Sequence, residues 1–143
     1  MDASMELSIV CGTNEKLRQE LKGIAAGDTR IHIYGFTDRM NNLMDSADLY
    51  LTKPGGLSIT EAAAKRLPMV LIDAVAGCEK YNLDFFVESG GAATAEGPEE
   101  LAELCMALQK DEHRLAAMAE CLSGIVERNA AEVKHKHGSI SNC

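Results

Sequence analysis

The amino-acid sequence predicts an α/β fold built around a doubly wound parallel sheet. Short apolar segments typical of buried strands alternate with longer segments whose apolar residues recur at helical spacing. The connections are short, and glycines mark most of the expected turns, at Gly12, Gly35, Gly55 and Gly77. Because right-handed crossovers place every strand-to-helix turn at the carboxyl edge of such a sheet, we expect these turns to share a ligand-binding rim.

Two β-α units open the chain. Residues 5–11 are strand-like and end at a glycine, and the helix that starts at residues 13–15 carries its apolar residues on one face. Residues 30–34 alternate in polarity as a second strand, and a second amphipathic helix follows. The apolar positions of these two helices are Leu17, Leu21, Ile24, Met40, Leu43, Met44 and Ala47.

The later strands are shorter and more apolar. Residues 49–52 form the third expected strand, followed by an alanine-rich helix over residues 57–66. Residues 68–72 are an uninterrupted apolar run, typical of a strand buried on both faces. A helix over residues 80–89, a weak fifth strand over residues 91–94 and two closing helices complete the fold. The apolar stripes of the closing helices are Leu101, Leu104, Cys105, Leu108, Leu115, Met118, Leu122, Ile125 and Val126.

Length and charge set limits on the function. With 143 residues, 46% of them hydrophobic, the chain predicts one domain over residues 1–133 and a polar, disordered tail over residues 134–143. Its 14 basic and 22 acidic residues give a net charge of −8, which repels phosphate backbones and argues against nucleic acid as a partner. No apolar run reaches the roughly 20 residues that span a bilayer, and no secretion signal is recognisable, so a cytoplasmic location is expected.

Cysteine and histidine placement predicts neither a disulfide framework nor a metal site. The five cysteines are scattered and include no C-x-x-C pair. The histidines lie in a predicted strand, an exposed helix turn and the tail, and Cys78 has no histidine near it in sequence that could activate it. We therefore interpret Cys78 as a structural or substrate-lining residue and expect no metal and no cofactor.

The most informative segment is the glycine turn between the third strand and its helix. Gly55 and Gly56 let the backbone approach a ligand closely, and the helix that follows offers free N–H groups and a positive dipole end to an anion. The same residues allow a second interpretation, in which Ser58 and Glu61 form a capping box and the turn is only a connector. Both interpretations stay open on the residues alone.

Four segments in order resemble the C-terminal half of family 28 glycosyltransferases, the group that includes bacterial enzymes glycosylating diacylglycerol. The segments are VCGTNEKL at residues 10–17, YGFTDRM at 34–40, TKPGGLSITEA at 52–62 and GCEKYN at 77–82, and the likeness covers residues 6–130. The resemblance implies a Rossmann-like domain, the C-terminal half of a GT-B enzyme, here without its first β-α unit. It also implies a UDP-sugar as donor substrate.

The resemblance assigns ligand contacts to individual positions. Glu61 would accept hydrogen bonds from both ribose hydroxyls, Phe36 and Thr37 would border the uracil, and Cys78 and Glu79 would lie at the sugar hydroxyls, with Asn82 beside them. The family usually has glutamine in the place of Cys78, so an amide is missing from the sugar contact. The residues expected to bind the pyrophosphate are Gly55, Gly56, Leu57 and Ser58.

The same resemblance implies that parts of the enzyme lie outside this chain. Family members open this domain with another strand, a phosphate loop and a helix, preceded by an N-terminal acceptor domain that carries the proposed general base. No catalytic residue is therefore expected here, and the chain by itself is expected to be inactive. The absent strand would be central, so the sheet would have to rearrange or be completed by another chain, most simply a second copy.

Three functions follow as alternatives. The first is the UDP-sugar-binding domain of an inverting hexosyltransferase with a diacylglycerol-type lipid acceptor, peripheral at the membrane in the complete enzyme. The second is a stand-alone catalytic subunit that needs a separate, membrane-anchored acceptor subunit. The third is a non-catalytic α/β interaction module whose glycine turn only caps a helix.

Overall fold

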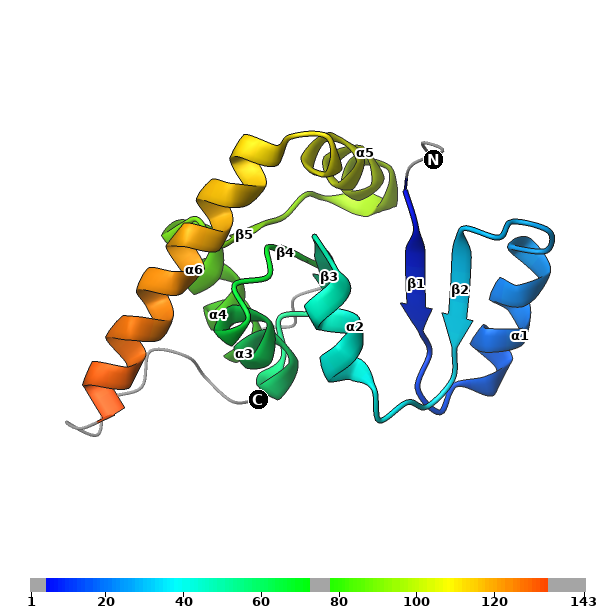
Figure 1. Cartoon of the computed structure of the whole chain (residues 1–143), viewed down its shortest axis with the longest axis horizontal. Helices are drawn as coiled ribbons and strands as arrows, with labels where there is room; N and C mark the ends of the chain where they lie inside the picture. The colour runs from blue at the N-terminus through cyan, green and yellow to red at the C-terminus, as the bar shows by residue number, and fades with distance from the viewer. Residues whose placement is uncertain (1–4, 73–77, 134–143) are drawn as a thin grey trace. The chain divides into compact units, whose positions relative to one another are not determined.

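Strands and helices alternate along the chain in the order that the sequence predicts (Figure 1). This computed structural model describes residues 5–72 and 78–133, and of residues 56, 57, 78, 79 and 126–133 it describes the backbone alone. The strands within these ranges are β1 (Leu7–Val10), β2 (Ile31–Tyr34), β3 (Tyr50–Thr52), β4 (Met69–Leu71) and β5 (Ala92–Ala93). The helices are α1 (Glu15–Ile24), α2 (Met40–Ser46), α3 (Gly56–Ala64), α4 (Cys78–Ser89), α5 (Gly97–Gln109) and α6 (Glu112–Val133).

All strand pairings are parallel, which confirms the predicted α/β class. β1 pairs with β2 in a two-stranded sheet, and β3, β4 and β5 form a three-stranded sheet in that order. Within the described residues no strand pairing joins the two sheets. The chain divides into two compact units, Met1–Asp45 and Ser46–Cys143. The single domain over residues 1–133 stays a prediction, and the predicted tail lies outside the described residues.

The first unit contains a parallel β-α-β motif and has little buried surface. The side chain of Asn14 caps helix α1, because its Oδ1 accepts a hydrogen bond from the Leu17 N–H at 3.0 Å. Asp28 holds Arg30 at the start of β2 through an ion pair of 3.0 Å, and the hydrogen bonds from Arg30 lower the pKa of the Asp28 carboxyl. Met44 is the one buried apolar side chain among the described residues of this unit.

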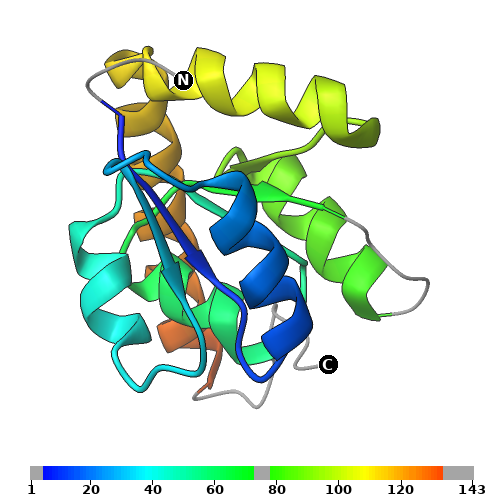
Figure 2. The same cartoon turned by 90° about the vertical axis from the view of Figure 1, so that its right-hand side faces the viewer.

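The second unit holds the hydrophobic core. Strand β4 is buried along its whole length, as the uninterrupted apolar run predicts. Helix α6 contacts α3, α4 and α5, and Figure 2 shows it descending from the end of α5 after a sharp turn. Asp111 immediately precedes α6 and caps its start, since its Oδ1 accepts a hydrogen bond from the Arg114 N–H at 3.0 Å. The central buried cluster consists of Val70, Ala93, Leu108 and Met118.

Helix α3 ends in a Schellman motif with an arginine in the left-handed position. Arg66 has φ of 58°, its N–H donates to the Ala63 carbonyl at 3.0 Å, and the Leu67 N–H donates to the Ala62 carbonyl at 2.9 Å. Glycine usually occupies this position because it has no Cβ to clash in the left-handed conformation. The tight reversal leads directly into β4, so α3 and β4 are fixed to each other at this end.

A change of Gly91 to alanine tests the packing of α6 on the three-stranded sheet. A Cβ at position 91 would lie 2.4 Å from Cδ2 and 2.8 Å from Cγ of Leu122, whose side chain is fully buried. We expect Gly91→Ala to lower the free energy of unfolding by about 1 to 3 kcal/mol, because the core must shift to admit the methyl group. Chemical denaturation monitored by circular dichroism measures this loss.

Gly124→Ala provides the matched control, since it makes the same change within α6. A Cβ at position 124 meets no described atom within 4 Å, so alanine should stabilise the helix by about 0.5 to 1 kcal/mol. Equal effects of the two substitutions would contradict the close packing of Leu122 on Gly91.

Candidate functional site

The carboxyl edge of the three-stranded sheet carries the glycine turn. Thr52 at the end of β3 lies beside Leu71 at the end of β4, and the Ile72 N–H donates to the Thr52 carbonyl at 3.0 Å. Thr94, just after β5, donates its hydroxyl to the Leu71 carbonyl at 2.7 Å. The turn at residues 53–55 therefore leaves the sheet at the edge where the chain also leaves β4, as expected for parallel strands.

Helix α3 begins without a side-chain cap. Its N-cap residue is Gly55, in an extended conformation with φ of −110° and ψ of 136°, and this residue has no side chain that could cap the helix start. Ser58 is the third residue of the helix and not the residue before it. The capping-box interpretation of Ser58 and Glu61 is therefore wrong, because that motif needs the hydroxyl at the N-cap.

Ser58 and Glu61 instead lie one helical turn apart on α3. Residues three apart on a helix are neighbours on its surface, so the hydroxyl and the carboxylate share one side of α3. Glu61 is exposed, while Ser58 is half-buried with its Oγ 3.2 Å from the hydroxyl oxygen of Tyr50 on β3. The pair thus combines an accessible carboxylate with a hydroxyl that Tyr50 on β3 positions through a hydrogen bond.

Asn82 supports the same turn from helix α4. Its side chain is fully buried, with 0% of its surface exposed, and its Nδ2 donates a hydrogen bond of 3.3 Å to the carbonyl oxygen of Pro54. Pro54 is itself buried, whereas Gly55 beside it is partly exposed. The turn is consequently fixed on its inner side and accessible on its outer side.

Other predicted contact residues are positioned only in part. Helix α4 begins at Cys78, with Glu79 in its first turn. Gly56 and Leu57 begin helix α3. The side chains at these four positions lie outside the described part of the chain, so their ligand contacts stay predictions.

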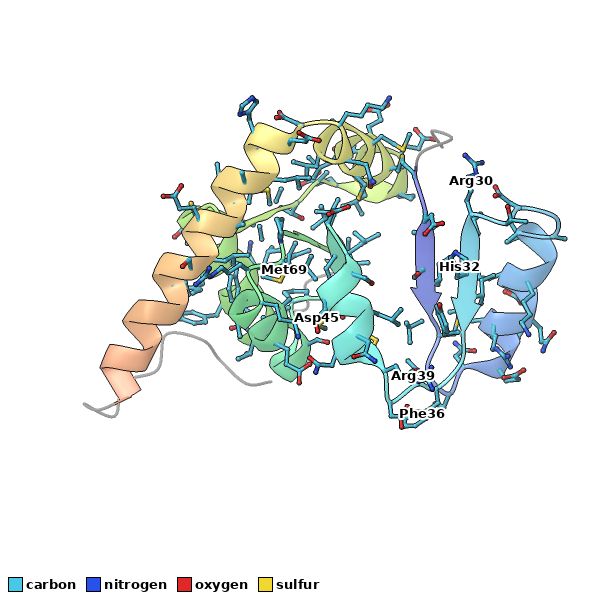
Figure 3. All side chains as sticks on the ribbon, in the orientation of Figure 1. Arg30, His32, Phe36, Arg39, Asp45 and Met69 are labelled. Carbon is cyan, nitrogen blue, oxygen red and sulfur yellow. The ribbon has the colours of Figure 1, made fainter. Side chains whose placement is uncertain are left out.

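Phe36 and Thr37 belong to the first unit, in the loop between β2 and α2. Figure 3 shows Phe36 at the tip of this loop, and its side chain is 79% exposed. The Oγ1 of Thr37 accepts a hydrogen bond from the Arg39 N–H at 3.0 Å, which fixes the loop just before α2. The glycine turn, in contrast, belongs to the second unit.

Sequence reasoning missed Tyr50 as a part of this site and included Pro54 only as a member of the segment at residues 52–62. The sequence predicts Tyr50 only as part of a strand, and a contact across eight residues between strand and helix has no sequence signature. The bond from Asn82 to Pro54 joins positions 28 residues apart. A signal existed only in the order of the elements, because helices that follow adjacent parallel strands begin at the same edge.

Two further features concern metals and membranes. His32 lies on strand β2, as predicted (Figure 3), and His113 is exposed in α6. Within residues 5–72 and 78–133, no three side chains of the His, Cys, Asp and Glu types gather where one ion could bind them. None of the helices in those ranges combines the length and the apolar character needed to cross a bilayer.

Comparison with known proteins identifies related sequences. A profile of the glycosyltransferase family 28 C-terminal domain matches residues 2–137. A processive diacylglycerol beta-glucosyltransferase of Staphylococcus carnosus is 36% identical over 115 residues, covering 80% of this chain and 29% of that protein. The protein of the same name from Bacillus subtilis is 34% identical over 134 residues, covering 92% of this chain and 35% of that protein. The chain thus spans about a third of the length of these relatives.

Proposed function

Since the chain belongs to glycosyltransferase family 28, by its match to the family's C-terminal domain, we propose that it binds the UDP-sugar donor of an inverting hexosyl transfer to a diacylglycerol-type lipid. The supporting observation is the start of helix α3, where a glycine N-cap leaves the first N–H groups without a side-chain cap beside an exposed carboxylate. Uncapped N–H groups at the positive end of a helix favour a diphosphate.

The proposed contacts are those that the family resemblance assigns to individual positions. The backbone at Gly55 and the first turn of α3 bind the pyrophosphate, with the Ser58 hydroxyl as a further donor. Glu61, exposed one turn later, accepts from the two ribose hydroxyls, because an ionised carboxylate offers two acceptor oxygens. Phe36 and Thr37 border the uracil, and Cys78 and Glu79 lie at the hexose.

The site contributes to the reaction by stabilising the leaving group. An acceptor hydroxyl attacks the anomeric carbon, the bond to the diphosphate breaks, and negative charge grows on the departing UDP. Helix N–H groups aimed at that oxygen stabilise the charge where it develops, and such preorganised donors need no rearrangement during the reaction. The proton of the acceptor hydroxyl goes to a general base that we propose lies elsewhere in the complete enzyme.

Replacing Glu61 with alanine tests the ribose contact. Glu61 is exposed on a helix, where alanine is the strongest helix former, so the substitution should not destabilise the fold. We expect Glu61→Ala to weaken UDP binding by roughly 1 to 3 kcal/mol, since two charge-assisted hydrogen bonds are lost. Isothermal titration calorimetry with UDP and with 2′-deoxy-UDP measures this, and the variant should lose the ability to distinguish the two nucleotides.

Two further variants complete this test. Glu103→Ala makes the same change at an exposed position of α5 and should leave UDP affinity unchanged. Gly55→Val adds a Cβ that meets no described atom within 4 Å in an extended backbone, yet its side chain would obstruct the diphosphate. Unaltered UDP affinity in both Glu61→Ala and Gly55→Val would favour the non-catalytic module, and no affinity of the unchanged protein at millimolar UDP would exclude the donor site.

Catalysis requires more than this site, so we expect no transfer by this chain alone. A radiolabelled UDP-hexose assay with diacylglycerol vesicles should give no glycolipid product above the protein-free background. Addition of the acceptor part of a relative such as the Bacillus subtilis protein should restore product if the chain acts as a separate subunit. Turnover by the chain alone would show that it carries its own base and acceptor pocket. In the complete enzyme we propose a cytoplasmic, membrane-peripheral location.

The free sheet edges favour a partner strand. Within the described residues β1 pairs only with β2, and β3 pairs only with β4, so each leaves one edge unpaired. Exposed edges associate with other strands. A strand of a longer protein could fill them, and for the chain alone we expect self-association. Light scattering should give a mass near twice 15.4 kDa, and a monomer at all concentrations would refute pairing between copies.

A further inference from the structure

We propose that Asn82 is a positioning residue that holds the diphosphate turn, and that it does not contact the hexose. The inference rests on the proposed function and refines the role that the family resemblance gives to this side chain. It starts from the burial of Asn82, whose side chain has 0% of its surface exposed. A side chain enclosed by protein has no surface to offer to a sugar hydroxyl.

The hydrogen bond of Asn82 explains why an amide is buried at this point. Pro54 cannot donate a backbone hydrogen bond, but its carbonyl oxygen still needs a donor once it is buried. Asn82 Nδ2 supplies that donor at 3.3 Å from the second turn of α4. An unpaired carbonyl in the same place would favour a different conformation of the turn, so the bond selects the observed one.

The geometry of the turn transmits this restraint to the helix start. Pro54 immediately precedes Gly55, whose own N–H donates to the Lys53 carbonyl at 2.8 Å. The peptide that joins Pro54 to Gly55 is planar, so fixing the Pro54 oxygen also fixes the Gly55 N–H, which is used inside the turn. Asn82 therefore holds the turn that leads into α3, and through it the position of the first helical N–H groups that we assign to the diphosphate.

The two possible roles of Asn82 make different predictions for a series of nucleotides. A residue that holds the turn affects every ligand with a diphosphate equally, whereas a residue that contacts the hexose affects only the UDP-sugar. We expect Asn82→Ala to lower the affinity for UDP and for UDP-glucose by the same factor, about five- to tenfold, and the affinity for UMP by less. Calorimetry with the three ligands measures the three factors.

Two more variants serve as an alternative and a control. Asn82→Leu keeps the branched shape of the side chain without a donor, so it reproduces the ligand pattern if Asn82→Ala fails to fold. Asp84→Ala changes an exposed residue of the same helix, whose partner is Lys80 at 2.9 Å, and should alter none of the three affinities. A loss confined to UDP-glucose, or no loss at all in the Asn82 variants, would overturn the proposal.

A ligand-free measurement separates this proposal from the donor site. Amide hydrogen exchange of Gly55, whose N–H donates to the Lys53 carbonyl, should become at least about tenfold faster in Asn82→Leu, with little change at the buried strand β4. Failure of the unchanged protein to bind any of the nucleotides would refute the donor site. Unchanged exchange at Gly55 would refute the holding role, whatever the ligands show.

Discussion

The orientation of one short turn, residues 53–55, governs the proposed chemistry of this protein. The turn must bring the start of α3 to the surface while its own polar atoms are paired. Pro54 is enclosed and has no N–H to satisfy, whereas Gly55 stays accessible and its N–H donates to the Lys53 carbonyl at 2.8 Å. The enclosed Pro54 carbonyl is paired by Asn82 at 3.3 Å. These two hydrogen bonds fix the turn that leads into the first N–H groups of α3.

Helix α3 shows why an uncapped start is informative. Most helix starts gain about 1 kcal/mol from a serine, threonine, aspartate or asparagine cap, as helix α1 does with Asn14. In α3 the hydroxyl closest to the start, that of Ser58, lies beside Tyr50 on β3 and not at the cap position. The stabilising side chain is thus absent where a ligand would have to bind. Family membership gives this local observation a functional meaning that glycine alone would not have.

Much of the fold was predictable from the sequence because its signals are local. The apolar run at residues 68–72 marked β4, and Asn14 marked the start of α1. Exposure of Glu61 was consistent with its place on a helix surface. The roles of Tyr50 and Asn82 were not predictable, because each depends on a contact between elements that the sequence separates. The capping box was a wrong interpretation because its spacing requires a helix that starts after Ser58, whereas α3 starts at Gly56.

The uneven burial of the two units has a consequence for how readily each of them opens. Apart from Met44, the buried apolar side chains in the described residues all lie in the second unit, and the first unit rests on a two-stranded sheet that is marginal by itself. Regions with little buried surface open at lower free energy. The loop that we propose for the base therefore belongs to the unit that opens more easily, and the turn that we propose for the phosphates belongs to the unit that opens less often.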